Sequence, residues 1–205
     1  MSNDSTLLPE LVLATSNPGK LREFREILGE LPVTFESMAS FPEMELPEEG
    51  DDYEANAATK ARVIAEATGR PALADDSGIE VTALGGRPGP RSARFGGEGL
   101  DDAGRLAKLL RDLDASGATD RSARFVCLAA LAFPDGEVIT ARGECPGRIL
   151  DAPRGGRGFG YDPIFEVEGG GRSMAEIPPT EKNRISHRAR ALLSLREVIQ
   201  QRIAS

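Results

Sequence analysis

The residues best suited to chemistry begin at Thr15, where a short apolar segment meets the start of an amphipathic helix. Residues 15–20 are Thr-Ser-Asn-Pro-Gly-Lys, and apolar residues recur behind them at helical spacing. Pro18 suits a first helical position, because its missing N–H costs nothing there. Backbone N–H groups at this helix start and the charge of Lys20 would bind an anion, and Gly19 would let a ligand approach the backbone. The segment predicts a phosphate site. It lacks the spacing of the common nucleotide motifs, and an ordinary strand-to-helix turn is the alternative.

Two adjacent carboxylates, Asp75 and Asp76, form the second chemical signal, at the end of an apolar segment and before Ser77-Gly78. Successive strand residues face opposite sides, so both can serve one site only if the strand stops near Ala74 and Gly78 turns the chain. We expect one of the two to face a cleft. There it could hold Mg²⁺, which prefers hard oxygen ligands, or take a proton from water. A solvated Asp-Asp-Ser-Gly turn is the alternative interpretation.

Two further segments carry groups that could recognise a nucleobase. Phe159 and Tyr161 are flanked by glycines within 156–163, in a chain with 5% aromatic residues and no tryptophan, and such rings can stack on a base or pack as a hairpin corner. The segment 181–188 contains the only histidine, His187, beside Arg188, with Ser186 as a possible helix N-cap. Arginine pairs with the O6 and N7 acceptors of a 6-oxopurine, where adenine presents an amino group.

Alternating strands and helices position these segments, which predicts an α/β fold. We expect helices at 18–28, 51–68 and 101–113 and a closing helix after residue 181. The helix at 51–68 should face inward along Tyr53, Ala57, Ala61, Ile64 and Thr68, with Asn56 and Lys60 on the strip beside them. Expected strands are 11–15, 33–35, 71–75, 78–84, 123–133, 137–143 and 162–167, with a turn at 134–136 and an extended loop at 85–99.

Length, charge and cysteine count limit the class of protein. At 205 residues we expect a single domain over 1–205, with 1–9 as a disordered tail. The net charge of −8 argues against a nucleic-acid polymer as partner, whereas a small anion remains compatible with it. Cys127 and Cys145 lack zinc-like spacing and are expected to be reduced thiols. No segment resembles a signal peptide or a membrane span, so we expect a cytoplasmic protein.

These segments, in this order, resemble the inosine triphosphate pyrophosphatase family, the non-canonical purine nucleoside triphosphate pyrophosphatases. The resemblance covers nearly the whole chain and includes the segments 15–20, 56–60, 74–78, 85–95, 158–163 and 186–188. It implies an elongated ITPase-like α/β fold, with a long mixed twisted sheet, flanking helices and two lobes around a central cleft. It also implies a homodimer, Mg²⁺, and hydrolysis of ITP, dITP and XTP to the monophosphate and pyrophosphate, which cleanses the nucleotide pool and prevents incorporation into DNA and RNA.

The resemblance also assigns roles to individual residues. Asp76 would activate water and share the metal with Glu48, with Glu49 as the alternative ligand and Asp75 in a supporting position. The phosphates would be held by Thr15, Ser16, Asn17, Pro18, Gly19 and Lys20, with Lys60 beside them. Ser77 would contact substrate. The base would be enclosed by Phe159, Gly160, Tyr161 and Asp162 and read at its edge by Lys182, His187 and Arg188. Arg157 departs from the small or differently charged residue expected before the aromatic segment.

The sequence leaves two alternative functions open, and it does not explain how GTP would be rejected. A related pyrophosphatase for modified pyrimidine or methylated nucleotides would need a different base edge. A nucleotide sensor would lack catalytic carboxylates, whereas here Asp75, Asp76, Lys20 and Lys60 are all present. Because O6 is shared with guanine, rejection of GTP needs a feature at the purine 2-position, and the sequence does not show one.

Overall fold

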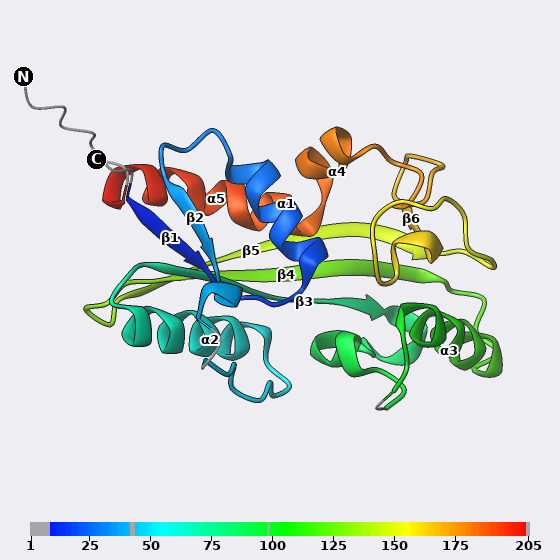
Figure 1. Ribbon diagram of the computed structural model, residues 1–205. Coiled ribbons are helices and arrows are strands. Elements are labelled where there is room, and N and C mark those ends of the chain that lie inside the picture. Colours follow the sequence, from blue (N-terminus) through cyan, green and yellow to red (C-terminus); the bar gives the residue numbers. More distant parts are fainter. Residues whose placement is uncertain (1–8, 42–43, 98, 204–205) are drawn as a thin grey trace, which may run out of the picture.

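A six-stranded mixed sheet runs the length of the molecule, in the order β2-β1-β3-β4-β5-β6 (Figure 1). The computed structural model describes residues 9–41, 44–97 and 99–203, so residues 1–8 of the expected tail lie outside the described ranges. The strands are β1 (Glu10–Leu13), β2 (Thr34–Ser37), β3 (Ala72–Val81), β4 (Ser122–Ala132), β5 (Val138–Ile149) and β6 (Phe165–Val167). β1 pairs in parallel with β2 and β3, and the pairs from β3 to β6 are antiparallel. The expected mixed sheet is confirmed.

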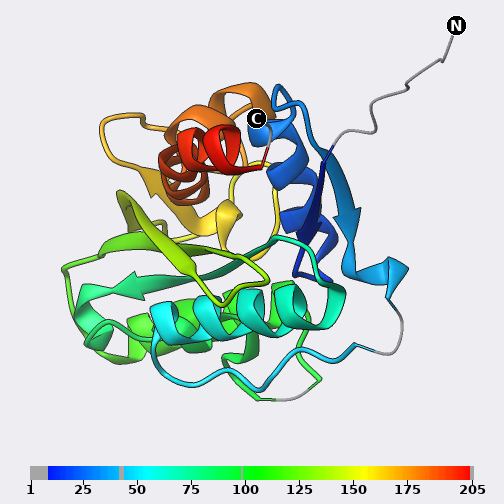
Figure 2. The same ribbon diagram turned by 90° about the vertical axis from the view of Figure 1, so that its left-hand side faces the viewer.

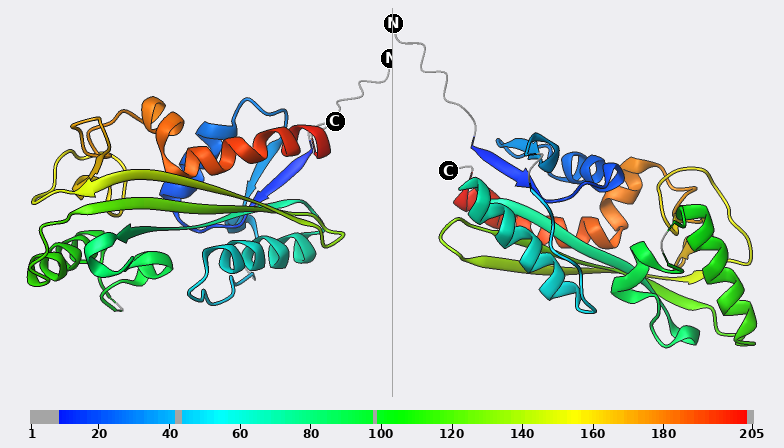
Figure 3. Two further views of the ribbon diagram at one scale, coloured as in Figure 1. Left: turned by 180° about the vertical axis from the view of Figure 1, so that it is seen from behind. Right: turned by 60° about the horizontal axis from the view of Figure 1, so that its bottom comes forward.

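Helices cover both faces of this sheet (Figures 1 and 2). On one face lie α1 (Pro18–Leu28), α4 (Pro179–Ile185) and α5 (His187–Arg202), and on the other lie α2 (Tyr53–Thr68) and α3 (Asp102–Ala115). Figure 3 shows the long β4–β5 hairpin passing between these two groups of helices. None of the helices in the described part of the chain combines the length and the apolar composition needed to cross a membrane.

The sequence predicts the locally encoded elements well. The helix at 18–28 is confirmed at both ends, and the hairpin with its turn at 134–136 is confirmed, with β5 extending to Ile149. Ser186 is an N-cap, because its side chain accepts a hydrogen bond from the Ala189 N–H. The closing helix is nevertheless two helices, since Ser186 has an extended backbone that separates α4 from α5.

Four other expected elements differ from the structure. The strands expected at 71–75 and 78–84 are one strand, β3, so Gly78 does not turn the chain. Antiparallel pairing with β4 is unbroken from Ala72 opposite Ala132 to Val81 opposite Ala123, and it keeps the Asp-Asp-Ser-Gly segment extended. The loop expected at 85–99 contains a 3-10 segment, η3 (Gly89–Arg94). The strand expected at 162–167 begins as a 3-10 turn and becomes β6 only at Phe165.

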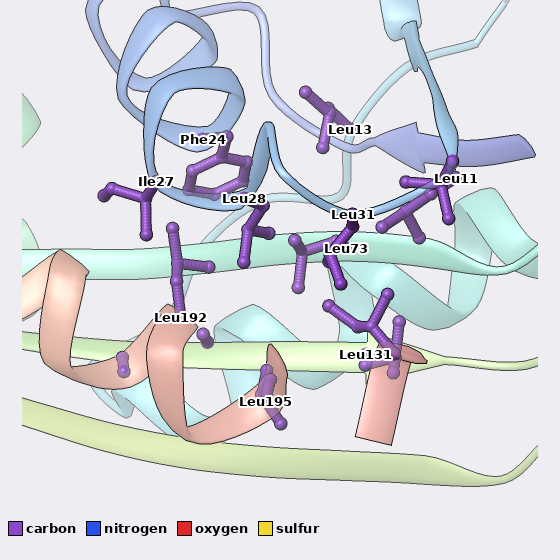
Figure 4. Close-up of a cluster of buried hydrophobic side chains, with 14 of the residues drawn as sticks. Leu11, Leu13, Phe24, Ile27, Leu28, Leu31, Leu73, Leu131, Leu192 and Leu195 are labelled. Carbon is purple, nitrogen blue, oxygen red and sulfur yellow. The ribbon is translucent and has the colours of Figure 1, made fainter. Parts of the chain in front are cut away.

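Side chains alternate across the central strands and supply a core on each face. Leu73 and Leu131 point to the face covered by α1 and α5, where they meet Phe24, Leu28 and Leu192 (Figure 4). Their neighbours Ala72, Ala74 and Ala130 point to the other face and pack with α2. A third cluster joins α3 to the far ends of β4 and β5 and to β6. The alternation matters for function, because it also places Asp75 and Asp76 on opposite faces of β3.

Candidate active site

A cavity of about 260 Å³ lies where the free edge of β3 meets both groups of helices. Among the described residues, β1 pairs with β3 only at Ala72 and Leu73. Further along β3, Asp76, Ser77 and Gly78 border the cavity. Most of the predicted site residues line this cavity: Asn17, Lys20, Asp76, Ser77, Phe159, Gly160, Tyr161, Asp162, Lys182, His187 and Arg188. The structure thus brings together segments that are far apart in the sequence.

The segment predicted as a phosphate site forms the start of α1, with Asn17 as the N-cap and Pro18 as the first helical residue. Asn17 caps the helix, since its Oδ1 accepts from the Lys20 N–H at 3.1 Å, and Thr15 Oγ1 accepts from the Asn17 N–H at 3.2 Å. Ser16 and Pro18 are exposed and lie outside the cavity lining. The expectation that Gly19 leaves space for a ligand is not met here. A Cβ at Gly19 would lie 2.6 Å from Phe159 Cδ1, so the small residue makes room for the Phe159 ring.

Asp75 belongs to a chain of buried charges of alternating sign that joins the two ends of the cavity. Lys20 Nζ lies 2.9 Å from Asp75 Oδ1, and Arg188 Nη2 lies 2.9 Å from Asp75 Oδ2. Arg188 Nη1 continues to Glu23 at 2.5 Å, and Glu23 contacts Lys182 at 2.8 Å. Lys182 ends the chain at Asp162, 2.5 Å away. We call this series, Lys20, Asp75, Arg188, Glu23, Lys182 and Asp162, the charge ladder.

The charge ladder keeps two of its carboxylates, Glu23 and Asp75, ionised. Burial raises the pKa of Glu23 and of Asp75, but the neighbouring cations outweigh it and hold both pKa values below their usual range. For Glu23 these cations are Arg188 and Lys182, and for Asp75 they are Lys20 and Arg188. A buried charge is tolerated only when it is paired and hydrogen-bonded in this way. The two ends of the cavity are therefore held at fixed positions relative to each other.

Asp76 lies on the other face of β3 and has a different environment. Asn56 Nδ2 donates to Asp76 Oδ2 at 2.7 Å. Burial raises the pKa of Asp76 to about 6; Lys60 and the Asn56 hydrogen bond oppose this, and Glu49 adds to it. A carboxylate with this pKa, in a cavity, can accept a proton from water near neutral pH. Asp75 and Asp76 thus differ because Asp75 forms direct ion pairs with two cations that outweigh its burial, whereas at Asp76 the effect of burial exceeds that of Lys60 and the Asn56 hydrogen bond.

Glu49, and not Glu48, lines the cavity beside Asp76. Glu49 forms an ion pair with Lys60, whose side chain is buried behind the lining. Glu48 is exposed and lies outside the lining. The sequence left either Glu48 or Glu49 as the second metal ligand. The structure places Glu49 in the same cavity as Asp76.

The opposite end of the cavity offers a flat ring and several donors. Lys182 Nζ lies 5.0 Å from the centre of the Phe159 ring and Arg188 Cζ 5.6 Å from it. The His187 ring stacks on Phe125, with centroids 4.7 Å apart, and its Nδ1 has no partner among the described residues. Burial and the nearby cations hold the pKa of His187 well below its usual range, so the ring is neutral.

Few donors of the two cations at this end remain available. Four hydrogen bonds from Arg188 to Asp75, Glu23 and Ser77 use four of its five N–H groups. Lys182 directs two of its three N–H groups to Glu23 and Asp162. Arg188 and Lys182 therefore each retain one N–H group that the described residues do not engage. If a nucleobase binds here, these two N–H groups and His187 are the groups available to hydrogen-bond its edge.

Several residues of the cavity lining and of the charge ladder were not predicted from the sequence. Glu23 gives one signal in retrospect, because it shares a helix face with Gly19 and Ile27, both buried. Phe125 looks like an ordinary strand residue, and Asp102 and Arg105 look like the surface of a helix start. Their place in the site follows from tertiary contacts alone.

The chain is similar to known proteins over nearly its whole length. The Ham1 family model matches residues 11–198. A dITP/XTP pyrophosphatase of Geobacter sulfurreducens is 50% identical over 191 residues, covering 93% of this chain and 96% of the relative. The solved structure of a HAM1 protein from Coxiella burnetii matches with a TM-score of 0.86 and 42% identity, over 95% of this chain and 100% of that one. A nucleoside-triphosphatase / dITP/XTP pyrophosphatase from Mycobacterium abscessus matches with a TM-score of 0.73 and 44% identity, over 91% and 98%.

The charge ladder predicts a large stability loss when its central carboxylate is neutralised. Glu23→Gln leaves Lys182 and Arg188 each short of a buried anion, and we expect it to lower the free energy of unfolding by about 3–5 kcal/mol. Glu30→Gln is the matched control, because Glu30 pairs with Arg196 while 82% exposed, and its loss should stay below about 1 kcal/mol. Urea unfolding of both variants measures the difference. Equal losses would show that the ladder is not a stabilising unit.

Proposed function

The chain belongs to the Ham1 family, and we propose that it hydrolyses non-canonical purine nucleoside triphosphates to the monophosphate and pyrophosphate. The preferred substrates are ITP, dITP and XTP, products of purine deamination, so the enzyme removes them before polymerases use them. One observation supports this most directly. A phosphate corner, a carboxylate of raised pKa and a base-sized wall with an aromatic ring line the same cavity.

The cavity residues divide the reaction between them. The start of α1 and Lys20 bind the phosphate oxygens, and Lys60 adds positive charge behind Glu49. Asp76 accepts a proton from the attacking water, and the bond between the α and β phosphates breaks, releasing pyrophosphate. Such a reaction needs positioning and charge neutralisation more than covalent help from the protein.

We propose Mg²⁺ as the cofactor, and the donor set fits it. Asp76 and Glu49 are close enough for the charge of Glu49 to raise the pKa of Asp76, a repulsion that a cation would relieve. Within the described ranges, no three His, Cys, Asp or Glu side chains gather around one metal position. Two carboxylates suffice for Mg²⁺, which usually keeps several waters and binds substrate phosphates as well. When bound, it neutralises phosphate charge.

Base selection on this proposal depends on donors at the edge of the ring. Phe159, Gly160, Tyr161 and Asp162 enclose the base, and the remaining N–H groups of Lys182 and Arg188, with His187, meet O6 and N7. A site built to hydrogen-bond this edge leaves buried groups unpaired when adenine enters, which disfavours ATP.

The oligomeric state and the cellular location are also part of what we propose. We infer a homodimer from the family resemblance, and a cytoplasmic location because the substrates belong to the cellular nucleotide pool. In analytical ultracentrifugation, a single species with a mass of about twice 21.8 kDa would agree with the dimer, and a single species of 21.8 kDa would contradict it.

A substrate panel tests the function. The purified protein is incubated with Mg²⁺ and ITP, dITP, XTP, GTP, ATP or dUTP, and pyrophosphate is separated from orthophosphate. We expect pyrophosphate from ITP, dITP and XTP, little turnover of ATP and GTP, and loss of activity when a chelator removes Mg²⁺. Orthophosphate as product would indicate a phosphatase, a preference for dUTP a related pyrophosphatase, and binding without turnover a sensor.

Asp76→Asn tests the proposed base. We expect the turnover of ITP to fall about a hundredfold or more, because the amide does not accept the proton. The free energy of unfolding should hold or rise, because the substitution removes a charge whose burial raises its own pKa. Asp112→Asn, which breaks a surface pair with Lys108, is the control with unchanged turnover. Near-normal turnover by folded Asp76→Asn would exclude Asp76 from the mechanism.

Paired variants decide which glutamate serves the metal. Because Glu49 lines the cavity and Glu48 does not, we expect Glu49→Gln to raise the Mg²⁺ concentration for half-maximal activity more than Glu48→Gln does. Titration of activity with Mg²⁺ for both variants measures this. The reverse order would assign the ligand to Glu48, as the family resemblance implies.

A further inference from the structure

The cavity contains one cation on the wall formed by α3, and the proposed reaction gives it no role. Arg105 lines the cavity from α3, three positions after Asp102. Its side chain is 22% exposed. The cations already discussed come from the start of α1, from α2 and from α4 and α5, so Arg105 faces them from a different part of the fold.

Arg105 has an unused donor. Its Nη1 lies 3.1 Å from Asp102 Oδ1, a carboxylate whose side chain is 58% exposed, and its buried Nε has no partner in the described residues. Lys20, Lys182 and Arg188 each contact a carboxylate that is almost fully buried. A buried N–H without an acceptor is unfavourable. Of its four terminal N–H groups, only one is engaged by a described residue, the Nη1 bond to Asp102. Because the side chain lines the cavity and is partly exposed, these terminal groups are suited to an acceptor supplied by a bound molecule.

The position of Arg105 points to the base and not to the phosphates. Asp102, its partner, accepts a hydrogen bond from the Gly160 N–H at 2.8 Å. Burial raises the pKa of the Tyr161 hydroxyl, and the charge of Arg105 opposes that rise, which places Arg105 beside the loop proposed to enclose the base. The groups that act most strongly on Asp76 are Lys60, Asn56, Glu49 and Lys20, and Arg105 is not among them.

The geometry of the two walls determines which edge of a purine Arg105 would meet. α3 lies on one face of the sheet, and α4 and α5 lie on the other (Figures 1 and 2). Phe159, Lys182 and His187 line the same cavity as Asp102 and Arg105 of α3. In the pose proposed above, with the O6 and N7 edge of the ring toward Lys182 and His187, the opposite edge, which carries N3 and C2, would face α3. At C2 hypoxanthine has a hydrogen, xanthine a carbonyl oxygen and guanine an amino group.

We propose that Arg105 reads the purine 2-position and favours a 2-oxopurine over a 2-aminopurine. This inference rests on the proposed function and deepens it. The xanthine O2 accepts a hydrogen bond from the guanidinium, whereas the guanine amino group is a donor and meets another donor. The xanthine ring of a nucleotide also loses a proton near neutral pH, which adds a charge attraction. Hypoxanthine gains nothing at this position and loses nothing.

Steady-state kinetics on XTP, ITP and GTP test the inference with the full-length protein. Arg105→Met keeps the apolar stem of the side chain and removes its donors. We expect kcat/KM for XTP to fall about tenfold or more, because a hydrogen bond to a charged group is lost, and kcat/KM for ITP to stay within about twofold. GTP turnover should hold or rise, so the XTP to GTP ratio falls. Arg111→Ala, an exposed arginine on the same helix, is the matched control and should change none of these values.

Equal losses on all three substrates would overturn the inference, because they would place Arg105 at the shared ribose and phosphates. Unchanged XTP turnover would overturn it as well. Calorimetric binding of XMP and GMP to wild type and Arg105→Met separates the inference from the reaction. If the wild type binds XMP in preference to GMP and the variant does not, Arg105 reads the 2-position even where the wild type hydrolyses neither ITP nor XTP, and only the proposed function fails. Equal XMP binding by wild type and variant rejects the inference.

Discussion

The site depends on a row of buried ion pairs more than on any single residue. The charge ladder passes from Lys20 on α1 through Asp75 on β3 and Arg188 on α5, back to Glu23 on α1, and then to Lys182 and Asp162. Each buried charge would be costly alone, and each is acceptable because its neighbours have the opposite sign. α1, α4, α5, β3 and the loop before β6 are therefore fixed relative to one another by electrostatics as well as by the apolar core beneath them.

The ladder also explains why two adjacent aspartates have opposite properties. Strand alternation sends Asp75 into the ladder, where cations keep it ionised. It sends Asp76 to the opposite face beside Asn56 and Glu49, where burial above all, and the charge of Glu49, raise its pKa to about 6. One carboxylate is held in buried ion pairs, and its neighbour has the raised pKa that the proposed proton transfer requires. A single residue step along a strand separates the two tasks, with no turn in the chain.

Sequence patterns predicted what is encoded locally. The helical spacing behind Pro18 and the turn at 134–136 gave α1 and the β4–β5 hairpin, and the segment order indicated the family. The continuity of β3 was missed, because Asp-Asp-Ser-Gly has the composition of a turn and only pairing with β4 keeps it extended. Glu23 was missed because its partners, Lys182 and Arg188, are distant in sequence, and Arg105 because nothing local distinguishes it from a helix surface.

The unbroken pairing of β3 with β4 limits how this site can change in evolution. Asp75 lies opposite Ala129 and Asp76 opposite Leu128, and side chains alternate along both strands. A one-residue slip of β3 would move every side chain to the other face, so Asp75 would meet Asn56 and Asp76 would meet the ladder cations. Substitutions can accumulate at single positions of these strands. An inserted or deleted residue within them would exchange the two carboxylates, and descendants of this chain are expected to keep both strand lengths while their sequences diverge.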